Sequence, residues 1–313
     1  MKSTKLDNIS PDLITKNPDN PRLVFRQEEL DTLLNSIKKV GIRVPLSIYE
    51  ETEKKKYVLL DGERRWMCAK KLNLDKIPVI IEPKPSRLEN ILRMFNIHNV
   101  RVQWDLYATA LKLQEVKRLL EKEGKPDSIK DLAAVTGVSE TTVKRAFELL
   151  KLPKKYLHLL EEELKRPKSE QKFSEDFFLE MMKAVKVIER YTPEIIEKTS
   201  KTKIMDSFKD KYEKGTITNI VKFRNVSKIA RSENAGVPSS KAVPILKKLI
   251  SDPKYTIDDA YQDSVAKAYE DRSLTRDIES ISERLSEINK KRLSPEFKAL
   301  LKKMKNIIET LLE

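Results

Sequence analysis

The residues most able to do chemistry lie together in one segment of this 313-residue chain, Leu59 to Trp66, where an apolar run ends in Asp-Gly-Glu-Arg-Arg. The pattern predicts a buried strand, a tight turn at Gly62 and a helix that begins with Glu63, Arg64 and Arg65. A helix N-terminus carries roughly half a positive charge, so arginines there favour a nearby anion. Backbone N–H groups and a glycine that permits close approach make phosphate the natural ligand. Alternatively, the two arginines are solvated or paired with a neighbouring acid.

The charge of the whole chain points in the same direction. Lysine and arginine number 63 against 49 aspartate and glutamate, which gives a net charge of +14 and an isoelectric point near 9.5. Such a balance favours a polyanionic partner, and nucleic acid is the first candidate. The alternative is that the charge only keeps a helical protein soluble.

The composition argues against several classes of site. Cys68 is the only cysteine and His98 and His158 are the only histidines, so an intramolecular disulfide, a cysteine-rich zinc site and a Ser-His-Asp triad have too few residues. No apolar run approaches about 18 residues, and the N-terminus lacks the apolar core of a secretory signal. We therefore expect a cytoplasmic protein that does not span a membrane.

Hydrophobic periodicity divides the chain into an α/β part and a helical part. The α/β part is predicted to contain helices at Glu28–Val40 and Gly62–Leu72 and strands at Pro45–Glu50, Tyr57–Leu60 and Ile77–Ile81. Because proline has no N–H to donate, Pro78 indicates either that the last strand lies at a sheet edge or that the proline stands at the start of the strand. From about Leu106 onward the periodicity is helical, with a polar, proline-containing break at Arg166–Lys172.

A second informative segment runs from Ser128 to Leu150. A Ser-x-x-Asp cap opens one helix, Gly137 permits a sharp turn, and a new helix begins at Ser139. This spacing is typical of a helix-turn-helix, or, as the alternative, of an ordinary helical hairpin. In a helix-turn-helix, the early and outward part of the second helix meets DNA bases and phosphates. The candidate DNA-binding residues are Ser139, Glu140, Thr141, Thr142, Lys144 and Arg145.

The order of these motifs resembles the ParB/RepB/Spo0J family, which is built on the ParB/sulfiredoxin superfamily domain. The similarity covers about residues 8–160 and rests on Asn20-Pro21-Arg22, Gly41-Ile42-Arg43-Val44-Pro45, Gly62-Glu63-Arg64-Arg65-Trp66 and the helix-turn-helix. It implies an α+β domain over residues 1–104, a helix-turn-helix DNA-binding domain over 105–165 and a helical C-terminal domain over 170–313.

The resemblance also implies a ligand. In the family, the Gly-Glu-Arg-Arg box contacts the triphosphate of a nucleotide, usually CTP, so Gly62, Glu63, Arg64 and Arg65 are expected nucleotide-binding residues, with ATP as another possibility and Mg²⁺ as the accompanying ion. A further family box falls on His98 to Val102 and retains Asn99, a candidate nucleotide and metal contact, while His98 replaces the magnesium-binding Glu. Val44 replaces a Gln that typical members carry.

Other members of the superfamily suggest enzymatic alternatives. The catalytic cysteine of sulfiredoxins lies where Glu63 stands here, and Cys68 falls on the apolar side of its helix, so it is expected to be a core residue. A kinase or nuclease could use Asp61 and Glu63 as base or metal ligands. Such an enzyme has no need of a helix-turn-helix.

The C-terminal helices carry apolar stripes. Residues alternate by four and three from Leu274 to Ile288, and a broad stripe follows from Phe297 to Leu312. An intrachain core and a homodimer interface both fit this pattern, and we favour the homodimer.

Together these features predict a nucleoid-associated, double-stranded-DNA-binding protein with a CTP-type switch, acting in plasmid or chromosome partition or in transcriptional regulation. A ParA-type ATPase is a possible partner. Any catalysis would be at most a slow, DNA-stimulated NTPase (CTPase) activity. The alternatives are a nucleotide-dependent kinase or nuclease on the same fold, and a DNA-binding regulator with a degenerate nucleotide pocket.

Overall fold

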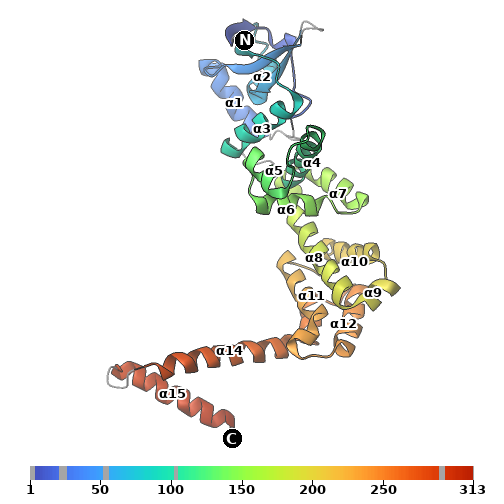
Figure 1. Cartoon of the computed structure of the whole chain (residues 1–313), viewed down its shortest axis with the longest axis vertical. Coiled ribbons are helices and arrows are strands. Elements are labelled where there is room, and N and C mark those ends of the chain that lie inside the picture. Colours follow the sequence, from blue (N-terminus) through green and yellow to red (C-terminus); the bar gives the residue numbers. More distant parts are fainter. Residues whose placement is uncertain (1–3, 21–26, 52–55, 102–104, 289–292, 313) are drawn as a thin grey trace. The chain divides into compact units, whose positions relative to one another are not determined.

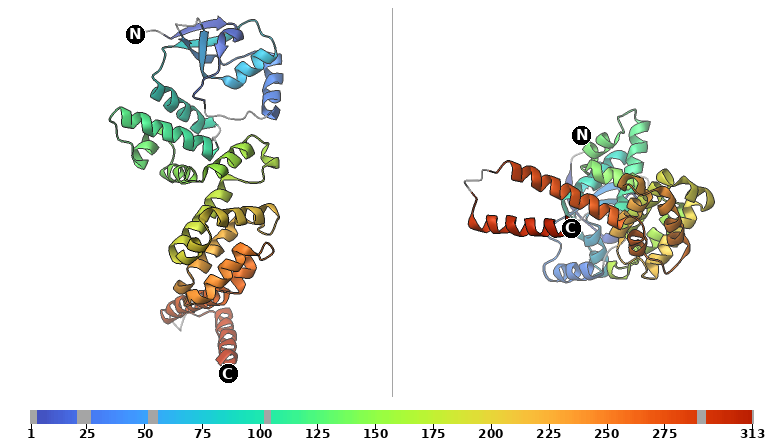
Figure 2. Two further views of the ribbon diagram at one scale, coloured as in Figure 1. Left: turned by 90° about the vertical axis from the view of Figure 1, so that its right-hand side faces the viewer. Right: turned by 90° about the horizontal axis from the view of Figure 1, so that it is seen from below.

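A computed structural model describes residues 4–20, 27–51, 56–101, 105–288 and 293–312, with the backbone alone at 28, 29 and 97–101. The chain forms two compact units, Met1–Lys183 and Ala184–Glu313, which Figures 1 and 2 draw from three sides. Each unit is described by itself below. The finer division of the first unit at residues 104 and 165 remains a prediction.

The first unit begins with a five-stranded mixed sheet of order β1-β5-β3-β4-β2. The strands are β1 (Lys5–Ile9), β2 (Ile14–Thr15), β3 (Leu46–Glu51), β4 (Lys56–Asp61) and β5 (Ile77–Glu82). β3 is antiparallel to β4 and parallel to β5. The three strands expected from periodicity are therefore confirmed, whereas β1 and β2 are short and have no clear periodic signal.

Pro78 lies at the start of a strand and not at a sheet edge, because β5 runs between β1 and β3. The proline sits opposite Asn8 of β1, and pairing with β3 begins only at the next residue, where Val79 faces Leu46. A residue without an N–H is tolerated there since the ladder to β3 has not yet begun. The edge-strand alternative is therefore wrong for this proline.

Helices α1 (Gln27–Val40) and α2 (Glu63–Lys71) pack against each other beside the sheet (Figure 1). The α2 residue Ala69 joins a buried cluster with β-strand residues Leu46, Ile48, Leu59 and Val79. Cys68 is 2% exposed, and burial raises the pKa of its thiol. A buried thiol with a raised pKa has little thiolate character, so the expectation that Cys68 is a core residue is confirmed.

Gly62 sets the direction of α2. Its φ is +102°, a value that L side chains rarely adopt, and a Cβ there would lie 2.8 Å from Cγ of Leu46 and 3.1 Å from Nη2 of Arg65. Both conformation and space therefore require glycine. Gly41, which ends α1 with a φ of +70°, differs because a Cβ at that position would meet open space.

The rest of the first unit is helical. Its helices are α3 (Arg87–Arg101), α4 (Leu106–Lys122), α5 (Ile129–Thr136), α6 (Glu140–Leu149), α7 (Lys154–Leu164) and the first half of α8 (Glu175–Tyr191). Buried residues from α3, α4, α5 and α6 form one continuous core, which includes Ile91, Phe95, Leu113, Leu132 and Val143. The helix-turn-helix thus shares its core with the helices that follow the sheet.

The beginning of α8 is anchored to this helical core. The Glu175 carboxylate accepts a hydrogen bond of 2.6 Å from the backbone N–H of Tyr107 in the first turn of α4. Phe173, Phe177 and Phe178 pack together, with ring centroids 5.1 to 6.0 Å apart. Burial is the main cause of the raised pKa of Glu175.

The second unit contains α9 (Pro193–Lys198), α10 (Lys201–Glu213), α11 (Phe223–Ala230), α12 (Ser239–Ser251), α13 (Ile257–Gln262), α14 (Ala266–Ser286) and α15 (Pro295–Leu312). Phe208 and Phe223 meet edge to face in its core. Lys211 is 2% exposed, and its ammonium donates to the carbonyls of Asp252 and Tyr255. The described part of the chain also has four 3₁₀ turns, at Pro11–Leu13, Lys168–Glu170, Ile220–Lys222 and Ser232–Ala235.

The last two helices have no buried residue among those described. Their apolar stripes are open, with Ile278 57% and Ile307 52% exposed. Among the described residues the two helices thus form no fully buried core, although Leu285, Phe297, Leu301 and Met304 are half-buried. Over the described ranges, no helix is both long and apolar enough to cross a membrane.

Replacing Gly62 with alanine should lower the free energy of unfolding by about 3 kcal/mol, since left-handed strain costs roughly 1–2 kcal/mol and overpacking roughly 1–3 kcal/mol. Gly41→Ala is the matched control and should cost only about 1–2 kcal/mol, because it adds strain without a clash. Urea unfolding of both variants measures the difference. Equal losses would contradict the packing that the structure gives Gly62.

The anchor at Glu175 should make stability depend on pH. Burial raises the pKa of Glu175 in the folded state. Its protonated form therefore contributes its full stabilisation below the unfolded-state pKa, and this stabilisation is lost as the pH rises through the folded-state pKa. Glu175→Gln keeps an acceptor for Tyr107 but does not titrate. Compared with this variant, the wild-type protein should lose stability as the pH rises from about 4, near the unfolded-state pKa of a glutamate, through the folded-state pKa. Chemical unfolding across that range tests this, and a constant difference would contradict it.

Candidate functional site

The N-terminus of α2 is built by residues from three parts of the first unit. Glu63 in the first turn accepts a hydrogen bond from the side-chain amide of Asn20, and a carboxylate suits this end of a helix. Pro21 and Arg22, the next residues of the Asn-Pro-Arg box, lie outside the described residues. The Gly62 turn, α2 and the segment before residue 21 therefore meet at one place.

Arg65 clamps the Gly62 turn to the chain that enters β3. Its Nη1 donates to the carbonyls of Val44, at 2.5 Å, and Pro45, at 2.9 Å, and its Nη2 lies 3.3 Å from the Asp61 carboxylate. Only 16% of the Arg65 side chain is exposed. Arg65 is thus paired with a neighbouring acid, which was one of the two alternatives that the sequence left open for the arginines. Its role in nucleotide binding remains a prediction.

Arg64 occupies a different side of the same helical turn. Consecutive helix positions differ by about 100°, and the charge of Arg64 acts on the thiol of Cys68, one turn further along, where it opposes the pKa increase caused by burial. Arg64 is half-buried. The two arginines therefore have separate surroundings, although both stand in the first turn of α2.

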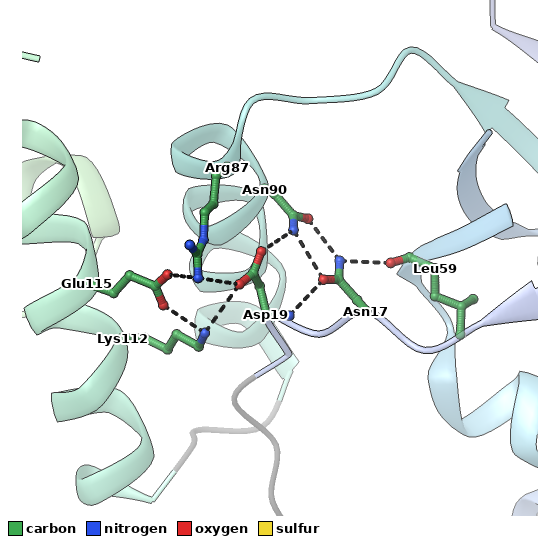
Figure 3. Close-up of polar contacts among 7 residues, drawn as sticks. All are labelled: Asn17, Asp19, Leu59, Arg87, Asn90, Lys112 and Glu115. Atoms are coloured by element: carbon green, nitrogen blue, oxygen red, sulfur yellow. Dashed lines mark hydrogen bonds and ion pairs between the residues drawn. The ribbon is translucent and has the colours of Figure 1, made fainter. Parts of the chain in front are cut away.

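A polar network joins this region to the helices that follow (Figure 3). Asn17, 4% exposed, donates to the Leu59 carbonyl at 2.8 Å and exchanges hydrogen bonds of 3.0 and 3.2 Å with Asn90. Leu59 lies in β4, three residues before the Gly62 turn. The buried amide pair therefore fixes α3 to the strand that leads into the candidate anion site.

Asp19 extends the same network to α4. Its carboxylate lies 3.4 Å from Arg87 and 3.8 Å from Lys112, and both cations also contact Glu115. Figure 3 shows these four charged groups meeting between α3 and α4. Asp19 is 13% and Lys112 15% exposed, so this pair is shielded from solvent more than ordinary surface ion pairs, whereas the side chain of Arg87 is 56% exposed.

The predicted contact at Asn99 cannot be placed, because the side chains of His98 and Asn99 lie outside the described residues. Both positions fall near the C-terminal end of α3. Within the described ranges, no group of three or more His, Cys, Asp or Glu residues could hold a metal ion.

The helix-turn-helix geometry follows from its caps. Ser128 and Asp131 form a reciprocal capping box at the start of α5, and Gly137 ends the helix with a φ of +71°. The Ser139 hydroxyl then accepts from the Thr142 N–H to begin α6. Val143 and Ala146 are buried against Leu132. Both side chains therefore belong to the core that α5 and α6 share.

Most of the candidate DNA-binding side chains of α6 are accessible. Ser139, Glu140, Thr141, Lys144 and Arg145 are exposed, whereas Thr142 is half-buried, with its hydroxyl 2.9 Å from that of Ser139. Glu140 and Lys144 form a loose ion pair at 3.7 Å. Arg145 forms an ion pair with Asp176 of α8, a contact between residues 31 positions apart that no periodicity could reveal.

Sequence reasoning also missed Asn17, Asp19, Asn90 and Lys112. The run Asn17-Pro18-Asp19-Asn20-Pro21 has the composition of a turn. Nothing in its spacing indicates partners in α3 and α4, which are about 70 to 90 residues away in the sequence. A satisfied buried amide pair of this kind becomes visible only in the folded structure.

Comparisons with known proteins agree with the sheet domain and its motifs. Residues 1–100 match the family model described as the ParB N-terminal domain. The chromosome-partitioning protein ParB of Caulobacter vibrioides is 30% identical over 144 residues, which are 45% of this chain and 45% of the relative. The chain thus spans about half the length of the curated relatives it matches.

Two solved structures of C-terminally truncated ParB from Caulobacter crescentus also match. One is a complex with CTP-γ-S, with 26% identity, coverage of 49% of this chain and 83% of the other, and a TM-score of 0.30. The second is a complex with the centromeric parS site, with 22% identity, coverage of 72% and 98%, and a TM-score of 0.42. The similarity to ParB proteins that these comparisons show is therefore that of residues 1–100 to the ParB N-terminal domain, and of about half of the chain to the curated relatives.

Proposed function

We propose that this protein is a ParB-type partition or regulatory factor that binds double-stranded DNA through α5 and α6 and is switched by a nucleoside triphosphate bound at the N-terminus of α2. The observation that carries the proposal is the Gly62 turn, which opens a helix with Arg64 and Arg65 inside a domain that matches the ParB N-terminal family. Backbone N–H groups at such a terminus suit a phosphate.

CTP is the first nucleotide to test, because the family usually binds it and CTP-γ-S is the ligand of the Caulobacter crescentus ParB. We assign Gly62, Glu63, Arg64 and Arg65 to the triphosphate and add Asn99 from the family motif. Mg²⁺ commonly accompanies a triphosphate through its phosphates and few protein ligands. Any hydrolysis would be slow and stimulated by DNA.

The polar network supplies a physical route between the two sites. Asn20 contacts Glu63 at the proposed phosphate site, and its chain neighbour Asp19 contacts Arg87 of α3 and Lys112 of α4. Helices α4, α5 and α6 share one core. A nucleotide that binds one arrangement of residues 17–20 better than another would therefore shift the arrangement of α3 and α4.

DNA binding is supported by the accessible face of α6 and by the basic charge of the chain. The parS site is the DNA in the second Caulobacter crescentus complex. The DNA sequence that this chain prefers would be identified by selecting binding sites from random duplexes. The main alternative is a regulator with a degenerate pocket, and its distinguishing property is DNA binding without any response to nucleotide.

A homodimer through the C-terminal helices completes the proposal. The stripes on α14 and α15 expose large apolar side chains, including Leu274, Ile278, Leu300 and Ile307, and the spacing of four and three on α14 is that of a coiled-coil seam. A second copy of the same chain would cover both stripes and supply equal and complementary surfaces.

Changing both Arg64 and Arg65 to alanine should abolish CTP binding while leaving basal DNA affinity within about twofold, because α6 is not altered. Of the single variants, Arg64→Ala should weaken binding without loss of stability. Arg65→Ala should also lower stability, since it removes the contacts to Val44, Pro45 and Asp61. Isothermal titration with CTP, ATP, GTP and UTP plus Mg²⁺ measures the affinity.

Arg118→Ala is the charge-matched control, because Arg118 is an exposed residue of α4 outside the proposed site. Unchanged CTP affinity in the double variant would refute the phosphate assignment. If the wild-type protein binds none of the four nucleotides, the remaining hypothesis is a DNA-binding regulator with a degenerate nucleotide pocket.

A glutamate at Ile278 or at Ile307 should dissociate the dimer, because a charge would be buried in an apolar interface. Sedimentation velocity at micromolar concentration should show a change from two copies to one. Lys302→Glu, on the polar side of α15, is the control and should remain dimeric. A wild-type protein that is monomeric at these concentrations would disprove the proposed interface.

A further inference from the structure

Arg145 and Asp176 form a contact that the proposed function does not explain. Arg145 stands on α6, the proposed recognition helix, and its Nη2 pairs with Oδ1 of Asp176. Both side chains remain partly open to solvent, at 47% and 60% exposure. An acid beside a DNA-facing arginine is unfavourable for general DNA binding, because its charge repels phosphates.

Asp176 is held in place by well-packed neighbours. The adjacent Glu175 caps α4 through the Tyr107 N–H, and Ser174 accepts from the Phe177 N–H at the start of α8. Glu163, 2% exposed, accepts from the backbone N–H groups of Lys172 and Phe173. The segment that carries Asp176 is therefore fixed to the same helical core as α6.

The geometry distinguishes two roles for Arg145. If it bound a phosphate, the phosphate would have to compete with a fixed carboxylate for the same guanidinium. If it read a base, the carboxylate would orient the planar fork, and it would be repelled only by the partial charges of the guanine acceptors O6 and N7 and not by a full phosphate charge. The ion pair engages Nη2 alone among the guanidinium nitrogens, so other N–H groups remain to face DNA.

We propose that Arg145 reads a guanine in the major groove and that Asp176 is the positioning residue that orients its guanidinium for this contact. The inference rests on the proposed DNA-binding function and adds to it a specificity-determining pair. Asp176 acts through Arg145, so its specific effect is on the choice of base at one position.

The experiment selects binding sites from a library of random duplexes with the wild-type protein, Arg145→Ala, Asp176→Asn and the double variant. The selected site is then tested as individual duplexes that carry each of the four base pairs at every position. Glu162→Gln, on α7, removes the same charge from an exposed pair with Lys165 and is the matched control. Circular dichroism checks that each variant is folded.

The expected result is a loss of guanine preference at one and the same position. Arg145→Ala should lower that preference about tenfold or more, as for a bidentate contact, and Asp176→Asn should lower it by a smaller factor. The double variant should match Arg145→Ala, because Asp176 acts only through that residue. Affinity for random duplex should rise modestly in Asp176→Asn, because one negative charge beside the DNA is removed, while the guanine preference falls.

Two results would overturn the inference. If Asp176→Asn binds every duplex more tightly and with a steeper salt dependence, and keeps the wild-type guanine preference, Arg145 contacts phosphate and Asp176 acts as an electrostatic brake. If both single variants select the wild-type site with the wild-type base preferences, the pair has no part in recognition. If the wild-type protein enriches no sequence, the proposed site-specific DNA binding itself is refuted. This outcome differs from a failure of the Arg145–Asp176 inference, in which the wild-type protein still selects a site.

Discussion

The left-handed backbone at Gly62 is the constraint on which the rest of the first unit depends. With a φ of +102°, it turns the end of β4 directly into α2 and brings the backbone close to Leu46 of β3. This close approach allows the Arg65 guanidinium to reach the carbonyls of Val44 and Pro45. One residue without a side chain thus joins a strand, a helix and a loop, and exposes a helix N-terminus at their junction.

The buried polar network connects that junction to α3 and α4, which share a core with the proposed DNA-binding helices α5 and α6. Buried amides and shielded charges are costly unless every partner is present, and here Asn17, Asn90 and Asp19 satisfy one another and the Leu59 carbonyl. Because the partners come from β4, α3 and α4, a displacement at one end changes contacts at the other. Such an arrangement suits a protein whose two ligands are proposed to influence each other.

The last two helices differ from the other described parts of the chain in how much apolar surface they bury. The first unit and the helices α9 to α13 have buried cores of their own. By contrast, the described parts of α14 and α15 bury no residue, although both carry regular apolar stripes. Sequence periodicity shows that an apolar face exists, but it does not identify the surface that covers it.

The sequence by itself determined the elements and the local sites. Hydrophobic period, glycine position and capping residues were sufficient for β3, β4, α2, the Ser128–Asp131 capping box and the Gly62 turn, because these depend on residues within a few positions of one another. Only the tertiary structure decided which elements meet. The pairs Asn17–Asn90, Asp19–Lys112 and Arg145–Asp176 join residues far apart in the sequence, and no local pattern encodes such contacts. The interior position of β5 and the clamping contacts of Arg65 were decided in the same way, by chain packing.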